Sequence, residues 1–365
     1  ASAYGPDGTS FFSYFSCIFF NQAKLPEETA TAVQAIKDGL KAYNLIRETT
    51  STEPSRLAVY IPYADWCIER WQNCITPALD AFRQLGVSYD VLPFVPKKGE
   101  EILPFYPMNK NPEQADYLLQ NRYVVILPDI SGMQETDSEM IEDFVRRGGV
   151  VIAFGPRIPY GDRFDREKLW GARESVPVQS SRYYNRITVS KPGARTYKGQ
   201  SWSFGPIAST AWIPEKENMI AGFPDGTASV FSNEYGEGKT YVVTMSARNA
   251  VSICPDLVRD ILDDALACRD VYRPFDVYGA AGNMDISMNG GQSSYTISAA
   301  NYNSRPVDLV IKPLLLEPDK KYKLIDLKSG EVLSEKTGSG YRSIPVRVES
   351  NDFSAFGIEP ESEQN

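Results

Sequence analysis

Two aspartates lie in the loops that follow predicted strands, where ligand-binding side chains gather in α/β folds. Asp65 comes after the apolar run at 57–61, and Asp129 comes after the run at 123–127. Carboxylates in pairs can supply the acid and the base of glycoside hydrolysis. The other acids nearby recur on one predicted helix, where exposure to solvent is the simpler interpretation: Glu135, Asp137, Glu139, Glu142 and Asp143. Asp65 and Asp129 are therefore candidates for ligand contact, but the sequence does not pair them.

Histidine is absent from all 365 residues, and this excludes whole classes of chemistry. Neither a Ser-His-Asp nor a Cys-His triad can be assembled, and a zinc site would have to rely on cysteine and carboxylates alone. The five cysteines form no C-x-x-C pair and show no metal-ligand spacing, so free, buried thiols are predicted at Cys17, Cys67, Cys74, Cys254 and Cys268. We assign no catalytic residue and predict no metal.

Nucleotide and flavin binding are not predicted either. Neither a G-x-G-x-x-G motif nor a P-loop follows any predicted strand. A glutamine-amidotransferase reaction would need a cysteine in a Gly-x-Cys-x-Gly elbow after a strand, together with a histidine base. The strand at 123–127 runs instead into Pro128, Asp129 and Ile130. The chain can share the scaffold of those enzymes but not their reaction, and we predict no cofactor.

The elements that would position these residues are clearest at 121–155. The run at 123–127 is short, apolar and rich in Val and Ile, which is typical of a strand buried on both faces. A second such run covers 150–154. Strand, helix and strand within 35 residues predict a βαβ unit with a right-handed crossover, and hence a parallel sheet.

The helix of this unit carries signals at both ends. Thr136 stands three residues before Glu139, the spacing of a capping box, which predicts that the helix begins there. Gly148 and Gly149 predict its end, because glycine adopts a left-handed C-cap at little cost. Between them, apolar residues recur at helical spacing and define a face toward a core: Met140, Ile141, Phe144 and Val145.

Strand–helix alternation covers the whole of 56–155. Strands are predicted at 57–61 and 88–92, with a helix carrying Ile75, Leu79 and Phe82 between them. This alternation predicts an α/β fold with a flavodoxin-like (glutamine-amidotransferase-like) doubly wound parallel sheet. Three later elements complete the domain: strands at 227–231 and 239–245, joined by a glycine-bearing hairpin, and a helix at 255–267.

A basic stretch interrupts this pattern from residue 156. Residues 156–200 hold ten Lys and Arg against four Asp and Glu, inside a chain of net charge −9. Basic residues interleaved with aromatic ones can bind single-stranded nucleic acid. The alternative, which we prefer, is an insertion packed on an acidic neighbour with its aromatics half-buried: Tyr160, Phe164, Trp170, Tyr183, Tyr184 and Tyr197. Together with the acidic pI near 4.9, this argues against a nucleic-acid or membrane partner.

The end of the chain has a different character. After Cys268 no helix is predicted, and short alternating runs follow at 295–299, 307–311, 322–326, 344–348 and 355–358. Glycine-containing turn signals separate these runs. Regular short strands of this kind predict a small antiparallel β-sandwich.

Three stretches, in this order, carry a resemblance to a known family: LAVYIPYADW, VVILPDISGMQETDSEMIEDFVRRGGVVIAFG and AGFPDGTASVFSNEYGEGKTYVVTMSAR. They resemble the trimerisation domain of family 42 glycoside hydrolases, the β-galactosidase-like enzymes. The resemblance implies a trimerisation-type domain over 55–270 with an insertion at 156–215, and a C-terminal β-sandwich over 271–365. Residues 1–54 resemble the last strand of the catalytic barrel and a connecting helix.

The resemblance also implies what this chain lacks. The acid/base and nucleophile glutamates of the family lie earlier in the barrel, and no position here matches either motif. Phe12 and Tyr14 fall near the strand that lines the family's sugar pocket, which implies contact with a galactoside-like carbohydrate. An exposed aromatic beside an acid is typical of interfaces, and Tyr63, Asp65 and Trp66 are predicted to form one.

We therefore expect the non-catalytic C-terminal portion of a β-galactosidase-like hydrolase, which mediates oligomerisation as a trimer and helps to wall a sugar site. Its partner would be a catalytic barrel domain or a companion chain. The alternatives are a stand-alone carbohydrate-binding or scaffolding protein without the barrel, and an autonomous hydrolase with unrecognised carboxylates. The apolar decamer at 11–20 lacks a basic n-region and is not a signal peptide by pattern, so the cytoplasm and the periplasm both remain open.

Overall fold

A computed structural model describes most of the chain: residues 56–60, 75–87, 89–92, 113–128, 135–155, 166–174, 182–209, 212–280, 284–290, 294–350 and 352–361. The chain forms two compact units. The α/β unit covers Ser55–Leu85 and Tyr89–Arg273, and the C-terminal unit contains Pro274–Asn365. The predicted barrel-end segment 1–54 lies outside the described residues.

A mixed sheet of eleven described strands forms the centre of the α/β unit, with nine of them in the order β2-β1-β3-β4-β11-β10-β9-β6-β7. Its first five strands are parallel: β2 (Asp90–Leu92), β1 (Leu57–Tyr60), β3 (Val124–Leu127), β4 (Val150–Phe154) and β11 (Gly238–Val243). The described ladders beyond β11 are antiparallel: β10 (Ala228–Tyr235), β9 (Met219–Gly222), β6 (Arg182–Val189), β7 (Ser201–Ser209), β8 (Trp212–Pro214) and β5 (Ala172–Glu174).

The predicted parallel sheet is therefore confirmed for five strands, but it is incomplete, because antiparallel strands extend it beyond β11. The antiparallel part begins at the predicted hairpin between β10 and β11. Tyr235 pairs with Gly238, so only two residues join these strands, and a turn that short can connect only antiparallel neighbours. The α/β unit has a mixed sheet.

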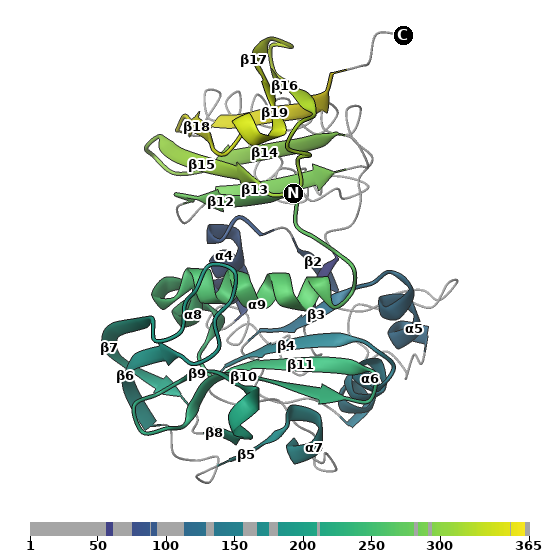
Figure 1. The fold of residues 1–365 in the computed structure, drawn as a ribbon, viewed down its shortest axis with the longest axis vertical. Helices are drawn as coiled ribbons and strands as arrows, with labels where there is room; N and C mark the ends of the chain where they lie inside the picture. The colour runs from purple at the N-terminus through teal and green to yellow at the C-terminus, as the bar shows by residue number, and fades with distance from the viewer. Residues whose placement is uncertain are drawn as a thin grey trace, which may run out of the picture. The chain divides into compact units, whose positions relative to one another are not determined.

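Helices cover both faces of the sheet (Figure 1). They are α4 (Thr76–Gln84), α5 (Glu113–Gln120), α6 (Glu135–Arg146), α7 (Arg166–Trp170), α8 (Ala247–Ile253) and α9 (Pro255–Ala267). Successive side chains of a strand point to opposite faces, and β4 shows the consequence. Val151 and Ala153 share a buried cluster with Ile141 of α6, whereas the ring of Phe154 lies 5.4 Å from that of Phe82 on α4. Both faces of β4 are buried, as its apolar run predicts.

The two ends of α6 differ in how well the sequence predicts them. Gly148 has a φ of 96°, and the amides of Gly148 and Gly149 donate to the carbonyls of Val145 and Phe144 at 3.0 and 2.8 Å. These are the two bonds of a Schellman C-cap, so the predicted end is correct. The helix begins at Glu135, however, so Thr136 lies inside its first turn and the predicted capping box is wrong.

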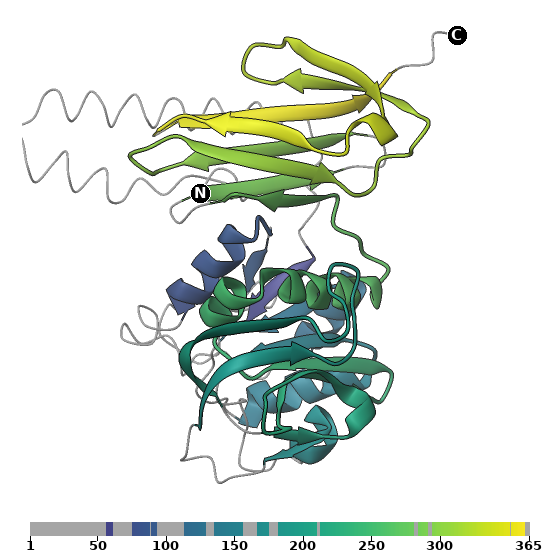
Figure 2. The ribbon, with the colours of Figure 1, turned by 60° about the vertical axis from the view of Figure 1, so that its left-hand side comes forward.

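The C-terminal unit contains two antiparallel sheets that share one apolar core (Figure 2). Its side chains alternate between buried and exposed along β15 and β18, as the predicted sandwich requires. One sheet has the order β12 (Phe275–Tyr278), β15 (Val307–Pro313) and β18 (Ile344–Val348). The other has the order β13 (Met284–Gly290), β14 (Tyr295–Asn301), β19 (Asp352–Pro360), β16 (Lys321–Asp326) and β17 (Val332–Thr337).

Candidate ligand-binding cleft

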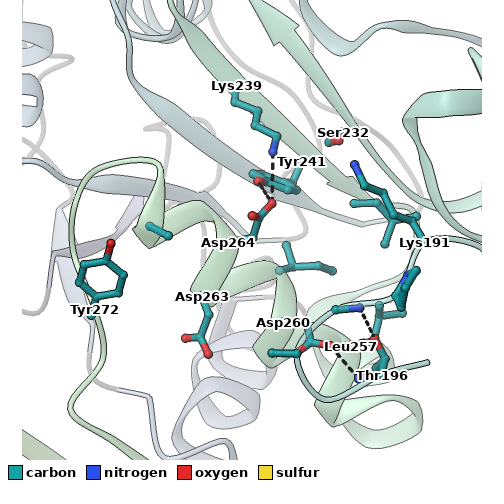
Figure 3. Close-up of a pocket in the computed structure, with 16 residues that line it drawn as sticks. Lys191, Thr196, Ser232, Lys239, Tyr241, Leu257, Asp260, Asp263, Asp264 and Tyr272 are labelled. Atoms are coloured by element: carbon teal, nitrogen blue, oxygen red, sulfur yellow. Dashed lines mark hydrogen bonds and ion pairs between the residues drawn. The ribbon is translucent and has the colours of Figure 1, made fainter. Parts of the chain in front are cut away.

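A cleft of about 420 Å³ lies within the α/β unit (Figure 3). One wall is the polar side of α9, and the loop at 191–196, which follows β6, forms the opposite wall. The floor comes from β9, β10 and β11. These elements place three aspartates of α9, namely Asp260, Asp263 and Asp264, around one space.

Asp260 holds the loop in place. The residue is 9% exposed, and its carboxylate accepts hydrogen bonds from the backbone amides of Arg195 and Thr196, at 2.9 and 3.1 Å, and from the Thr196 hydroxyl at 2.8 Å. Gly193 passes so close that an added Cβ would lie 2.2 Å from a carboxylate oxygen of Asp260. Asp260 therefore has a structural task, and the loop requires glycine at 193 for reasons of space.

Asp263 is neutralised by two arginines. Arg273 donates from Nε to one carboxylate oxygen at 2.6 Å, and Arg195 approaches the other oxygen at 2.8 Å. Both guanidinium groups are largely buried, so these ion pairs are shielded from solvent more than surface pairs are. The predicted packing of the basic stretch on an acidic neighbour is correct for this loop, since Arg195 contacts both Asp260 and Asp263.

Asp264 forms a polar cluster with the floor of the cleft. The buried Tyr241 hydroxyl donates to its Oδ2, and the Lys239 ammonium lies 3.1 Å from the same oxygen. Burial raises the pKa of the Asp264 carboxyl, but the Tyr241 hydrogen bond and the charges of Lys239 and Lys191 outweigh it and hold that pKa below its usual value. Burial, followed by the hydrogen bond to Asp264, raises the pKa of Tyr241 above its ordinary value. The cluster consists of a carboxylate, an ammonium group and a neutral phenol.

This arrangement fits binding better than acid–base catalysis. A glycosidase needs one carboxylic acid that is protonated beside one that is ionised. All three carboxylates of the cleft are already engaged by cationic or by N–H and O–H donors, and the pKa of Asp264 is held below its usual value, so none is placed as the protonated acid. Among the residues that the structure describes, no group of three or more Cys, Asp or Glu side chains is arranged to hold a metal ion.

Comparisons with known proteins show a likeness of fold. No protein-family model and no curated protein sequence matches the chain. The β-galactosidase from Bacillus circulans sp. alkalophilus aligns with a TM-score of 0.52 and 14% identity, over 88% of this chain and 45% of its own. A GH42 β-galactosidase from G. stearothermophilus aligns with a TM-score of 0.53 and 13% identity, over 93% and 45%.

The likeness covers part of those enzymes. The chain spans less than half of the length of these solved structures, and at 13–14% identity the alignment establishes the fold alone. It agrees with the resemblance of the three sequence stretches to the same family. The likeness to these β-galactosidases is thus one of fold, over less than half of their length.

The site residues predicted from the sequence lie outside the described residues. This holds for the substrate-contact pair Phe12 and Tyr14, and for the interface residues Tyr63, Asp65 and Trp66. Asp129, the second strand-end carboxylate, is also outside. Their roles remain predictions.

The cleft is a site that reasoning from the sequence missed. Its walls come from segments far apart in the chain, 191–196, 232–241 and 257–272, and none carries a motif. A signal did exist in the charges, because Asp260, Asp263 and Asp264 recur at helical spacing while 156–200 carries the excess of Lys and Arg. Two aromatics of that stretch, Trp170 and Tyr184, are 1% and 7% exposed, so they are not available for stacking on bases.

Proposed function

We propose that this chain is the non-catalytic C-terminal portion of a β-galactosidase-like glycoside hydrolase, and that its α/β unit mediates homo-oligomerisation. The observation that carries the proposal is the coverage of the fold comparison. The alignments include 88–93% of this chain but only 44–45% of the β-galactosidases, so both units belong to the shared region. Residues 55–270 would be the trimerisation-type domain and residues 271–365 its companion sandwich.

The sheet supports a finer assignment of the α/β unit. The parallel strands follow the order β2-β1-β3-β4-β11, which is the flavodoxin-like order with β11 in the fifth position. We infer a flavodoxin-like, glutamine-amidotransferase-like core whose fifth strand arrives after a long excursion through β5–β10. The antiparallel strands extend this core at the β11 side.

The remaining parts of the proposal come from the sequence resemblance. A catalytic barrel, as a domain or on a companion chain, would supply the acid/base and nucleophile glutamates. Phe12 and Tyr14 would help to wall its site for a galactoside-like carbohydrate. Tyr63, Asp65 and Trp66 would contribute to the contact between subunits of a homotrimer.

A stand-alone carbohydrate-binding protein is the second candidate, and the cleft is the observation that favours it. The two candidates differ in assembly: the first requires an oligomer, whereas the second does not. Both predict the absence of turnover by this chain.

The part of the chain that the structure describes has no helix long and apolar enough to cross a membrane.

A glycoside panel tests the catalytic part of the proposal. We expect the purified chain to release no nitrophenol from aryl β-galactosides, β-glucosides or α-arabinosides, because the carboxylates of the cleft are engaged and neither family motif is present. An active β-galactosidase in the same buffer is the control. Turnover that a single substitution within residues 1–365 abolishes would contradict the proposal, because the catalytic group would then belong to this chain.

A further inference from the structure

Two polar side chains of the cleft have no partner in the described part of the chain. Ser232 lies on β10, is 8% exposed and lines the cleft, yet its hydroxyl forms no hydrogen bond with any described residue. Lys191, in the loop after β6, likewise forms no ion pair or hydrogen bond with the described residues. The Ser232 hydroxyl and the ammonium group of the exposed Lys191 line the open cleft, so both can donate hydrogen bonds to a polar ligand there.

The charges around these two residues favour an anion. Figure 3 places Lys191, Ser232 and Lys239 at the same end of the cleft, beside Asp264. Two ammonium groups face one carboxylate there, and each ammonium can donate three hydrogen bonds. The other two carboxylates, Asp260 and Asp263, are already paired with arginines. This end of the cleft therefore has a surplus of positive charge and of donors.

The rest of the cleft fits a compact hydroxylated ring. Both hydrogen bonds that the Asp264 carboxylate accepts from described residues fall on Oδ2, so its Oδ1 can accept a hydrogen bond from a ligand hydroxyl. Tyr272 stands at the rim with 61% of its surface exposed, and Leu257 and Ile261 form an apolar wall. Small-molecule sites combine such walls with a few placed polar groups, in volumes of about 300–1,000 Å³.

We propose that this cleft binds a monosaccharide-sized polyol that carries one acid group, either phosphate or carboxylate. The acid group binds at the end of the cleft that Lys191, Ser232 and Lys239 form, and a hydroxyl of the ligand donates to Oδ1 of Asp264. The ring lies between Tyr272 and the side chains of Leu257 and Ile261. The inference does not rest on the proposed function, because all the groups that carry it belong to the α/β unit.

Calorimetric titration of the full chain tests this site. The probes are galactose 6-phosphate, galacturonate, galactose and inorganic phosphate. We expect one of the two anionic sugars to bind at least roughly tenfold more tightly than galactose and than inorganic phosphate, since a charge-assisted bond is added to those of the ring. The tighter of the two anionic sugars identifies the acid group as phosphate or carboxylate.

Matched variants assign the binding to named residues. Lys191→Gln should weaken binding of the tighter probe about tenfold, and Ser232→Ala should weaken it by a smaller factor. Lys198→Gln, in the same connection between β6 and β7 but outside the cleft, should leave the affinity unchanged. Thermal unfolding of each variant shows that it remains folded.

Four results would overturn the inference. The first is no binding of any probe at millimolar concentration, and the second is equal binding of galactose, which would mean that no acid group is recognised. The third is equal binding of inorganic phosphate, which would mean that the polyol contributes nothing. The fourth is an equal loss in Lys191→Gln and Lys198→Gln, which would indicate attraction to the general charge of the loop.

Discussion

The three aspartates of α9 that line the cleft bind different partners, although they lie within about one helical turn of each other. Asp260 accepts backbone amides, Asp263 pairs with two arginines, and Asp264 binds a phenol and an ammonium group. A pattern of acids on a helix is ordinarily exposed to solvent. Here the loop at 191–196 binds Asp260 and Asp263, so the partners of these two carboxylates come from a segment more than sixty residues away in the sequence.

Loss of the Asp260 carboxylate should release this loop. We expect Asp260→Ala to lower the free energy of unfolding by about 2–4 kcal/mol, because it leaves the amide and the hydroxyl of the buried Thr196 without their carboxylate acceptor. Asp116→Ala, on α5, is the control and should cost less than about 1 kcal/mol, because both side chains of its ion pair with Arg147 are at least 41% exposed. Urea unfolding measures both, and equal effects would contradict the anchoring role of Asp260.

Because the Tyr241 phenol is buried, we expect the protein to lose stability at alkaline pH. In the unfolded chain Tyr241 ionises with an ordinary pKa of about 10, whereas in the fold burial and the Asp264 hydrogen bond raise its pKa. The folded state therefore keeps a proton that the unfolded state releases, and the stabilisation present below pH 10 decreases as the pH rises further.

Tyr241→Phe isolates this contribution. The variant should be less stable than the parent at pH 7, because the hydrogen bond to Asp264 is gone, yet it should lose less stability between about pH 9.5 and 11. Tyr197→Phe is the control, since this tyrosine is 67% exposed and should keep the slope of the parent. Urea unfolding across this pH range gives the slopes, and parallel curves for the parent and Tyr241→Phe would refute the assignment.

Among the elements, the sequence predicts best those with a continuous apolar run or a regular apolar period. The predicted bounds of β4, α9 and β18 match the structure residue for residue. Their apolar patterns are continuous or regular, and Pro255 marks the start of α9. By contrast, β17 went unpredicted because its residues are mostly exposed and give no alternating pattern.

Other elements were recognisable individually, but their place in the sheet was not. The hairpin of β10 and β11 was predicted from its turn, whereas the parallel pairing of β11 with β4 was not. That pairing joins residues about ninety positions apart, and no local pattern encodes it. The cleft depends on this pairing, because it brings Lys239 and Tyr241 under α9.

Gly238, in the hairpin of β10 and β11, is expected to be sensitive to substitution. Gly238 passes the end of α6 so closely that an added Cβ would lie 2.1 Å from the Val145 carbonyl oxygen and 2.3 Å from that of Gly149. Backbone atoms cannot move aside as a flexible side chain can, so we expect Gly238→Ala to destabilise the protein by about 3 kcal/mol or more. Gly205→Ala, with no heavy atom within 4 Å of the added Cβ, is the control. Melting temperatures lowered equally in both variants would contradict this account.

For the whole molecule, assembly is the property that separates the two candidate functions. The interface prediction rests on Tyr63, Asp65 and Trp66, where an aromatic side chain stands beside an acid. Loss of a central aromatic anchor ordinarily costs 2 kcal/mol or more of association free energy, about thirtyfold in affinity. We expect Trp66→Ala to shift the oligomer toward monomer on dilution, whereas Tyr197→Ala should not. Unchanged association of Trp66→Ala would remove these residues from the interface.

The proposal that this chain is an oligomerising portion of a β-galactosidase-like enzyme is tested most directly by its mass in solution. Sedimentation equilibrium at micromolar concentration should give a single species of about 122 kDa, the mass of three chains of 40.7 kDa each. The value should persist over a tenfold dilution, as an interface of permanent type requires. A species of one chain mass across the same concentrations would contradict the proposal and favour the stand-alone binding protein.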